Sequence, residues 1–124
     1  MQVGALVGGS SEVVGPETTL FAAATALIAN GIGSLAVVDG RQLAGIITER
    51  DLVRATSQGI DPHDATVGQW MTTAPDTIGP DVDVDEAAAW LLEMGYRHLP
   101  VMDGDELLGI VSIRDLLWAI ASDS

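Results

Sequence analysis

The feature that most constrains the fold is an internal repeat with an offset of 64 residues. Residues 3–56 align with residues 67–120 without a gap, and 19 of the 54 aligned pairs are identical. One copy of this size is too small to bury a good core alone, so we predict two copies packed with pseudo-twofold symmetry. The polar, Gly- and Pro-containing residues 57–66 predict a joint between a first repeat, residues 1–56, and a second repeat, residues 67–124.

Each repeat predicts the order strand, helix, strand, strand, helix, which places the chain in the α/β (α+β) class. The first strands, residues 12–16 and 76–80, end in Gly-Pro, because proline cannot continue a ladder. An Asp-Gly step closes the second strand of each repeat and predicts a hairpin. In the second repeat, Asp83 is the predicted N-cap of the first helix and Gly95 its C-terminal stop.

Charge and composition exclude several classes of function. The formal net charge is −13 and the chain has no lysine, which disfavours nucleic acid and anionic membranes as partners. The absence of cysteine excludes disulfides and thiolate metal sites. The longest apolar run, residues 20–29, is too short to span a bilayer, and the N-terminus lacks the basic flank of a signal peptide. We therefore expect a cytoplasmic location.

The same motif occurs at the end of both repeats. It reads "GIITERDLVRA" around Thr48 and Asp51, and "GIVSIRDLLWA" around Ser112 and Asp115. A hydroxyl followed three residues later by an acid is typical of a capping box at a helix N-terminus. Such an N-terminus also attracts phosphate through its free N–H groups and its dipole. The motif alone leaves both interpretations open, a helix cap and a ligand site.

Together, the repeated order, the phrases "VVDG…LAGIITERDL" and "LPVMDGDELLGIVSIRDLL" and the 64-residue spacing resemble a tandem pair of CBS domains, a Bateman module. The joint "GIDPHDATVGQWM" is similar to that of actinobacterial hypoxic-response proteins. The resemblance covers nearly the whole chain. It implies a stand-alone, non-enzymatic regulatory sensor that binds AMP, ADP or ATP in clefts between the repeats. Mg²⁺ could accompany ATP, and S-adenosylmethionine or a dinucleotide could fit a similar cleft.

The resemblance also implies roles for individual residues. It assigns the ribose hydroxyls to Asp51 and Asp115, the phosphate region to Thr48 and Ser112, and an apolar adenine slot to the first strand of each repeat. Ile46–Ile47 and Ile110–Val111 would form the wall of that slot, although branched residues are also ordinary core. The predicted ligand-binding residues are Val13, Val14, Ile47, Thr48, Arg50, Asp51, Thr77, Ile78, Arg97, His98, Val111, Ser112, Arg114 and Asp115.

Three of the five arginines lie where they could reach a phosphate. Arg50 and Arg114 are inside the two motifs, and residues 97–98 are Arg-His where the first repeat has Gly-Ser at 33–34. Guanidinium binds phosphate bidentately, although Arg50 and Arg114 could instead pair with surface acids. We therefore expect the cleft that uses Asp115 to bind an anionic nucleotide more tightly.

Other functions compete with this interpretation. The chief alternative is a ligand-free dimerisation or docking module that regulates an unknown partner protein, and the family resemblance implies a homodimer. With two histidines and no enzymatic constellation, a metal site and a metal-dependent enzyme rank far behind. Among the tryptophans, Trp90 is predicted in the core and Trp118 at a dimer contact. The first repeat departs from the family pattern at Val7-Gly8, which predicts a looser N-terminus over residues 5–12.

Overall fold

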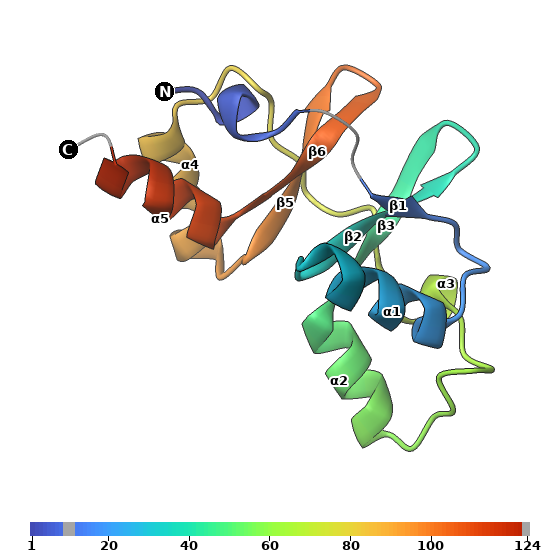
Figure 1. Ribbon diagram of the computed structural model, residues 1–124. Helices are drawn as coiled ribbons and strands as arrows, with labels where there is room; N and C mark the ends of the chain where they lie inside the picture. The colour runs from blue at the N-terminus through green and yellow to red at the C-terminus, as the bar shows by residue number, and fades with distance from the viewer. Residues whose placement is uncertain (9–11, 123–124) are drawn as a thin grey trace. The chain divides into compact units, whose positions relative to one another are not determined.

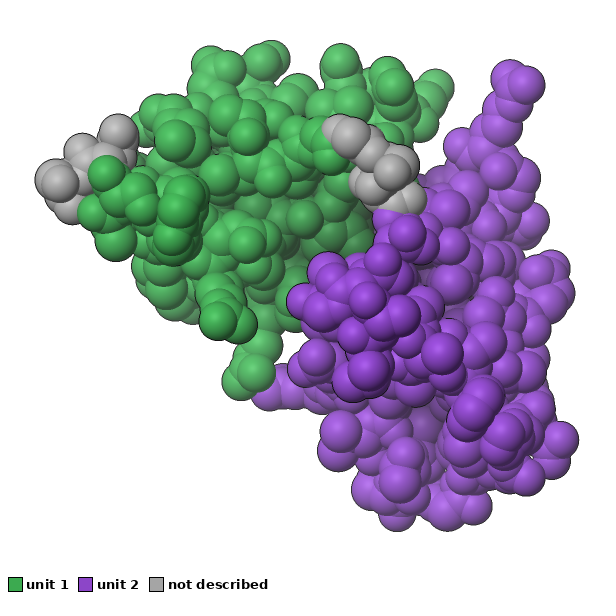
Figure 2. Space-filling view, viewed as in Figure 1, with its two compact units in different colours: residues 1–11, 76–124 green, residues 12–75 purple. Residues whose placement is uncertain are grey.

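A computed structural model describes residues 1–8 and 12–122 of the chain (Figure 1). The chain forms two compact units (Figure 2). Unit 1 comprises Met1–Ser11 and Asp76–Ser124, and unit 2 comprises Glu12–Pro75. Each unit has a hydrophobic cluster of its own. Within the described ranges, no helix combines the length and the apolar character needed to cross a membrane.

Unit 2 is a four-stranded sheet with helices. Its elements are β1 (Val13–Val14), α1 (Leu20–Asn30), β2 (Ser34–Asp39), β3 (Gln42–Thr48), α2 (Glu49–Ser57), α3 (Val67–Trp70) and β4 (Thr72–Thr73). The strands lie in the order β1-β2-β3-β4, with β1 parallel to β2 and the other neighbours antiparallel. Side chains of α1, α2 and α3 pack with Leu35, Val37 and Ile47 of the sheet to form the core of this unit.

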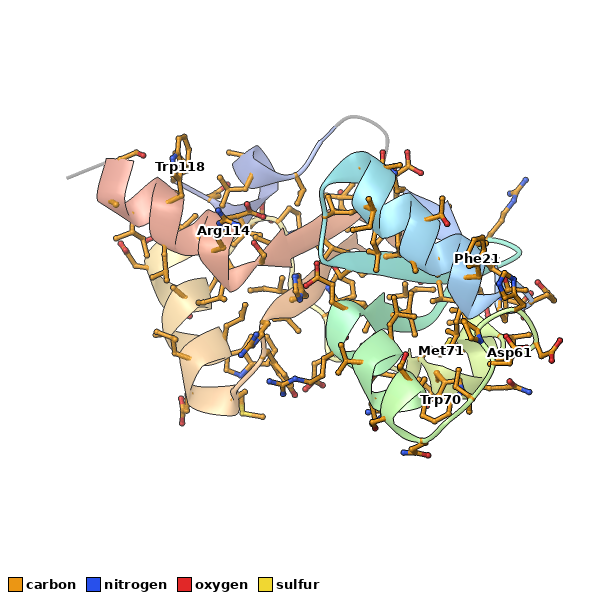
Figure 3. The ribbon with its side chains drawn as sticks, turned by 60° about the horizontal axis from the view of Figure 1, so that its bottom comes forward. Phe21, Asp61, Trp70, Met71, Arg114 and Trp118 are labelled. Atoms are coloured by element: carbon orange, nitrogen blue, oxygen red, sulfur yellow. The ribbon has the colours of Figure 1, made fainter. Side chains whose placement is uncertain are left out.

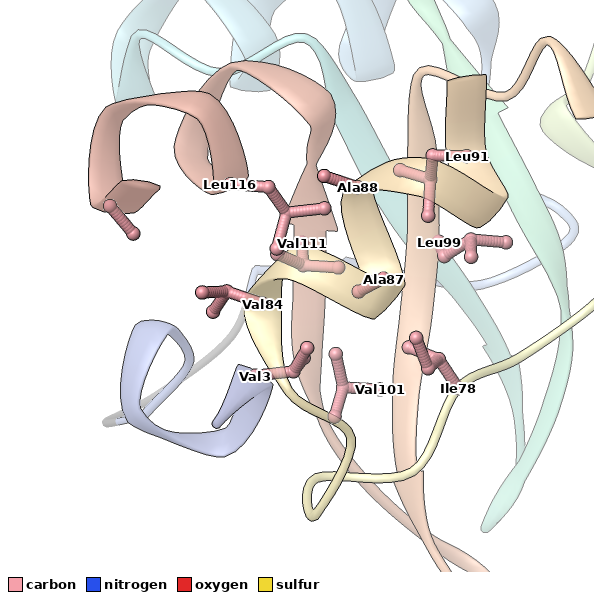
Figure 4. Close-up of a cluster of buried hydrophobic side chains, with 11 residues drawn as sticks. Val3, Ile78, Val84, Ala87, Ala88, Leu91, Leu99, Val101, Val111 and Leu116 are labelled. Atoms are coloured by element: carbon pink, nitrogen blue, oxygen red, sulfur yellow. The ribbon is translucent and has the colours of Figure 1, made fainter. Parts of the chain in front are cut away.

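Unit 1 repeats this plan with a smaller sheet. Its elements are the 3₁₀-helix η1 (Val3–Leu6), α4 (Val84–Met94), β5 (His98–Asp103), β6 (Glu106–Ser112) and α5 (Ile113–Ser122). The strands β5 and β6 are antiparallel, and Ile78 adds an isolated parallel bridge to Val101. Figure 4 shows the core of this unit, in which Leu91, Leu99 and Leu116 are almost completely buried. Burying each leucine stabilises the fold by about 1.5–3 kcal/mol.

The predicted α/β class is confirmed, and one predicted strand is shorter than expected. The first repeat has the full order strand, helix, strand, strand, helix, but the second replaces its first strand by the single bridge at Ile78. The reason is Pro100, which stands where the first repeat has Ala36. Proline has no N–H to donate to a neighbouring strand, so the ladder cannot extend further. The bonds that remain run from Ile78 N–H to the Pro100 carbonyl at 3.0 Å and from Met102 N–H to the Ile78 carbonyl at 2.9 Å.

The predicted helix ends and hairpins are confirmed. Asp83 caps α4, since its Oδ1 accepts a hydrogen bond from Val84 N–H at 3.1 Å. Helix α4 ends at Gly95, whose φ of 75° is left-handed and favours glycine. Both hairpins turn at the Asp-Gly steps, where Gly40 and Gly104 have φ of 64° and 60°.

The compact units do not follow the repeat boundaries seen in the sequence. The segment that leads into each repeat packs on the unit formed by the other repeat: η1 belongs to unit 1 and α3 to unit 2. Equivalent bonds hold the two segments, because Gly4 N–H donates to the Pro80 carbonyl and Gly68 N–H to the Pro16 carbonyl, both at 2.9 Å. The repeats therefore exchange their leading segments.

The N-terminal part of the chain is better packed than the sequence suggests. Leu6 and Val7 contact the core of unit 1, although a looser structure was expected over residues 5–12. Residues 9–11 of that stretch lie outside the described residues. Trp90 is partly buried against the same core and meets Tyr96 edge-on, with ring centroids 5.9 Å apart, as its predicted core position requires.

Candidate functional site

The motif of the first repeat forms a complete capping box at the start of α2. Thr48 N–H donates to Asp51 Oδ2 at 2.9 Å, the Thr48 hydroxyl donates to the same oxygen at 3.1 Å, and Asp51 N–H donates to Thr48 Oγ1 at 3.3 Å. The other carboxylate oxygen, Asp51 Oδ1, pairs with Arg54 Nη2 at 3.2 Å. Both oxygens of Asp51 are therefore in use, and only 6% of its side chain is exposed.

The motif of the second repeat makes the same cap at the start of α5 but leaves its acid open. Ser112 N–H donates to Asp115 Oδ2 at 3.3 Å, and Asp115 N–H donates to Ser112 Oγ at 3.0 Å. Asp115 is exposed. Among the described residues its Oδ1 has no hydrogen-bond or ion-pair partner. The start of α5 around Ser112 and Asp115, which we call the Ser112–Asp115 corner, can therefore accept hydrogen bonds from a ligand.

The second repeat also brings two arginines and a histidine to the start of α5. The carbonyl of Arg97 accepts a hydrogen bond from Ile113 N–H at 2.9 Å, which holds the backbone of Arg97 beside the first turn of α5. His98 is the strand partner of Ser112 in the β5–β6 register. Arg114 follows on α5 itself (Figure 3). Within the part of the chain that the structure describes, neither Arg97 nor Arg114 forms an ion pair, and the same holds for Arg50 in unit 2.

The residues predicted for the adenine slot divide between the two faces of each sheet. Ile47 and Val111 are fully buried in the two cores, so core packing accounts for both and neither is accessible to a ligand in this structure. Side chains alternate along a strand, so Ile46 and Ile110 point to the opposite face. Ile46 is nevertheless buried, with 5% exposed, so of the four predicted wall residues only Ile110 is partly exposed.

The first strands show the same division. Val14 and Ile78 pack on the cores, whereas Val13 and Thr77 are exposed. In unit 2, β2 lies between β1 and β3, so one strand separates Val13 on β1 from Thr48 at the end of β3.

Sequence reasoning missed one residue at this site, Arg54. Besides pairing with Asp51, its Nη2 donates to the Trp70 carbonyl at 3.2 Å, and its guanidinium lies 5.7 Å from the centre of the Trp70 ring. An acid and a base three residues apart on a helix are a possible signal for the Asp51 pair. No local pattern signals the contact with Trp70, which is 16 residues away in the sequence.

The described residues do not contain a group of three or more His, Asp or Glu side chains that could hold a metal ion. The two histidines lie in different units, and His63 stacks on Phe21 with ring centroids 4.3 Å apart.

Comparison with known proteins decides the family. The model of the CBS domain matches the chain twice, at residues 10–58 and 67–122. The chain belongs to the CBS domain family. A relative from Acidianus ambivalens, an uncharacterised 17.7 kDa protein, is 40% identical over 110 residues, which cover 87% of this chain and 66% of the relative. The chain spans 54% of a second relative, protein MK0525 of Methanopyrus kandleri, at 36% identity over 105 residues.

Solved CBS structures share the fold over almost their full length. A protein with CBS domains from Burkholderia ambifaria matches with a TM-score of 0.93 and 33% identity, covering 100% of this chain and 96% of the other. CBSX2 in complex with AMP matches with a TM-score of 0.81 and 27% identity, covering 98% and 97%. Protein MJ0100 in complex with 5-methylthioadenosine and S-adenosyl-L-methionine matches with a TM-score of 0.89 and 25% identity, covering 100% and 98%.

The resemblance to hypoxic-response proteins is also confirmed. Hypoxic Response Protein I, solved with two coordinated zinc ions, matches with a TM-score of 0.77 and 27% identity, covering 96% of this chain and 98% of the other.

Proposed function

We propose that this CBS chain is a non-enzymatic regulatory sensor that binds an adenosine-containing nucleotide, AMP, ADP or ATP, at the Ser112–Asp115 corner. The observation that carries the proposal is the open carboxylate of Asp115, which is exposed and has one oxygen without a partner among the described residues. An ionised carboxylate accepts hydrogen bonds from two adjacent hydroxyls, which suits the diol of a ribose. The CBS structures solved with AMP and with S-adenosyl-L-methionine support the choice of ligand class.

The charges around this corner support a phosphate group on the ligand. Arg97 and Arg114 are both exposed and form no ion pair within the described residues, so neither must leave a partner to bind phosphate. Guanidinium groups bind phosphate through two parallel hydrogen bonds. The net charge of −13 acts in the opposite direction, because it repels a multiply charged anion. ATP should therefore depend on Mg²⁺ for binding more strongly than AMP does.

Thermal-shift measurements with AMP, ADP, ATP, S-adenosylmethionine and NADH, with and without Mg²⁺, test this function. A ligand at one hundred times its Kd should raise the free energy of unfolding by about 2.7 kcal/mol. Calorimetry then tests the site. Asp115→Ala and Arg97→Ala should each weaken AMP binding by about tenfold or more, because a hydrogen bond to a charged group contributes about 1.5–3 kcal/mol.

The exposed Asp105 in the β5–β6 turn provides the matched control, since Asp105→Ala removes the same charge from the same unit. Its affinity for AMP should equal that of the wild type. If Asp115→Ala and Arg97→Ala bound AMP as tightly as this control, the nucleotide would lie elsewhere.

A ligand-free docking or dimerisation module remains the second candidate, because unit 1 exposes a set of large apolar side chains. Leu92 on α4 is 63% exposed, and Leu117 and Trp118 on α5 are 49% and 67% exposed. Trp118 projects outward from α5 (Figure 3). A flat thermal response to every nucleotide, together with a dimer that Trp118→Ser dissociates, would favour this function over the sensor.

A further inference from the structure

In unit 2, Arg54 lies beside Asp51, the residue that corresponds to Asp115 of the Ser112–Asp115 corner in unit 1. One nitrogen of its guanidinium, Nη2, contacts both Asp51 Oδ1 and the carbonyl of Trp70 at 3.2 Å. The group also lies 5.7 Å from the centre of the Trp70 ring, within the range of a cation–π interaction. We call this set of contacts among Arg54, Asp51 and Trp70 the Arg54 bridge.

With the Arg54 bridge in place, both carboxylate oxygens of Asp51 have partners. Its Oδ2 already accepts two hydrogen bonds from Thr48, and Arg54 takes Oδ1. With 6% of the side chain exposed, Asp51 has no accessible oxygen to offer to a ribose diol. A ligand hydroxyl could bind only by displacing the guanidinium, which would leave a nearly buried carboxylate without its counter-ion. The cost falls on the carboxylate, because Arg54 is itself 51% exposed whereas Asp51 would be left as a nearly buried charge without its counter-ion.

The guanidinium is held from two elements rather than one. Arg54 and Asp51 lie on α2, whereas Trp70 ends α3, so the bridge ties the motif of the first repeat to the segment leading into the second. Val67 anchors α3, since it is fully buried and its N–H donates to the Thr18 carbonyl at 2.8 Å. The position of the Trp70 carbonyl is therefore set by the core of unit 2.

The second repeat has no counterpart of this bridge. The 64-residue offset places Trp118 at the position of Arg54 and Leu6 at the position of Trp70. Trp118 carries no charge and is 67% exposed. Asp115 consequently keeps an open oxygen, although its spacing from Ser112 is the same as that of Asp51 from Thr48.

We infer that Arg54 closes the first repeat to ligands, so that each chain binds one nucleotide, and that removing Arg54 creates a second site at Asp51. This inference rests on the proposed function, because it concerns which copy of the motif accepts the adenosine ligand. Arg54 is thus a residue that determines the number of sites, and its side chain acts as an internal substitute for the ligand at Asp51.

Isothermal titration of the full chain with AMP, and with uncharged adenosine, tests the inference. The wild type should bind one equivalent, Asp115→Asn should weaken this binding by about tenfold or more, and Asp51→Asn should leave both affinity and stoichiometry unchanged. Arg54→Met keeps an apolar stem against Trp70 but removes the bridge, so it should bind two equivalents. Adding Asp51→Asn to Arg54→Met should return the stoichiometry to one.

Arg41→Met is the matched control, because the exposed Arg41 in the β2–β3 turn carries the same charge and lies outside the motif. This variant should bind one equivalent, which separates loss of the bridge from the change in net charge. Adenosine makes the same separation, since a neutral ligand is insensitive to the charge of the chain.

Four outcomes would overturn the inference, the last of them for the case in which Arg54→Met does not fold. Two sites in the wild type, one of them lost in Asp51→Asn, would refute it while leaving the proposed function intact. Weaker binding by Arg54→Met would show that Arg54 contacts the nucleotide instead of excluding it. If neither the wild type nor Arg54→Met bound AMP or adenosine, the proposed function would fail and this inference with it. Should Arg54→Met not fold, an affinity loss in Asp51→Asn alone would refute the inference.

Discussion

Asp51 and Asp115 hold equivalent places in the two repeats and cap equivalent helices, yet their surroundings differ. The residue three positions later decides this difference, because Arg54 neutralises and covers Asp51, whereas Trp118 leaves Asp115 exposed. A buried carboxylate persists only when it is paired and hydrogen-bonded. One difference between the repeats can therefore convert an exposed carboxylate into a paired and buried one.

Tyr96 offers a direct test of side-chain electrostatics in unit 1. Its hydroxyl donates a hydrogen bond to Asp76, and this bond, with smaller contributions from desolvation and from the charge of Asp76, raises the pKa of Tyr96 above its ordinary value of 10.0. Asp76→Asn should bring the pKa down toward 10.0. The chain contains one tyrosine, so the ultraviolet absorbance of tyrosinate reports this group alone.

The same bond predicts how stability depends on pH. Because the folded state binds the phenolic proton more tightly than the unfolded state, the stabilisation from neutral Tyr96 is complete below pH 10.0 and is lost as the pH rises through the folded pKa. The decline should be smaller in Asp76→Asn. Equal pKa values in the two proteins would contradict the hydrogen bond.

Local patterns explain which parts of the site were predictable. The capping boxes at Thr48 and Ser112 depend on atoms within four consecutive residues, so the sequence predicts them correctly. The Arg54 bridge depends on Trp70, whose position is set by the packing of α3 rather than by any neighbour in sequence. The family resemblance identifies both copies of the motif, but it does not show that Asp51 is paired and buried whereas Asp115 is exposed.

The elements themselves followed their sequence signals, with one instructive exception. Asp83 and Gly95 correctly indicated the ends of α4, and the Asp-Gly steps correctly indicated both hairpins. The exception is the first strand of the second repeat, predicted over residues 76–80, where Pro100 on the neighbouring strand leaves a single bridge at Ile78. A strand prediction that considers one segment alone cannot take into account that the neighbouring strand lacks a backbone N–H donor.

The segments that lead into the two repeats lie close to the Gly-Pro turns at Pro80 and Pro16. This close approach explains why glycine occupies positions 4 and 68. A Cβ on Gly68 would lie 3.0 Å from the Pro16 carbonyl oxygen and 3.2 Å from Pro16 Cβ. Gly68→Ala should therefore displace α3 and lower the free energy of unfolding by about 1–3 kcal/mol, the usual cost of overpacking.

Gly79→Ala is the control for this prediction, because a Cβ there meets nothing within 4 Å. Urea denaturation of the two variants measures the difference. Comparable free energies of unfolding would mean that the backbone contact between Gly68 and Pro16 does not constrain the chain.

The two ways of dividing the chain have different physical origins. The repeats, residues 3–56 and 67–120, reflect sequence similarity, whereas the units are defined by packing and include the exchanged segments η1 and α3. Sequence similarity shows that Val3 and Val67 are equivalent and apolar, but it does not show which core each one joins. Val3 is buried in the core of unit 1 and Val67 in that of unit 2.

This exchange predicts that the unit, rather than the repeat, is the smallest part of the chain that folds alone. Fragments 12–75 and 3–66 have the same length of 64 residues, but only the first includes α3 and β4. The second loses the fully buried Val67 and the hydrogen bonds from Val67 N–H to Thr18 and from Gly68 N–H to Pro16. Burial of a valine side chain contributes about 1.5–3 kcal/mol, and each hydrogen bond adds about 0.5–1.5 kcal/mol.

Urea denaturation followed by circular dichroism compares the two fragments. Fragment 12–75 should unfold cooperatively, with marginal stability because of its small core. Fragment 3–66 should be less stable by about 3 kcal/mol, which is enough to leave a domain of this size largely unfolded. Val67→Ala in fragment 12–75 should lower its stability and so reproduce part of this difference. A fragment 3–66 as stable as fragment 12–75 would mean that α3 contributes nothing to the core of unit 2, and the repeat boundaries would then describe the folding unit.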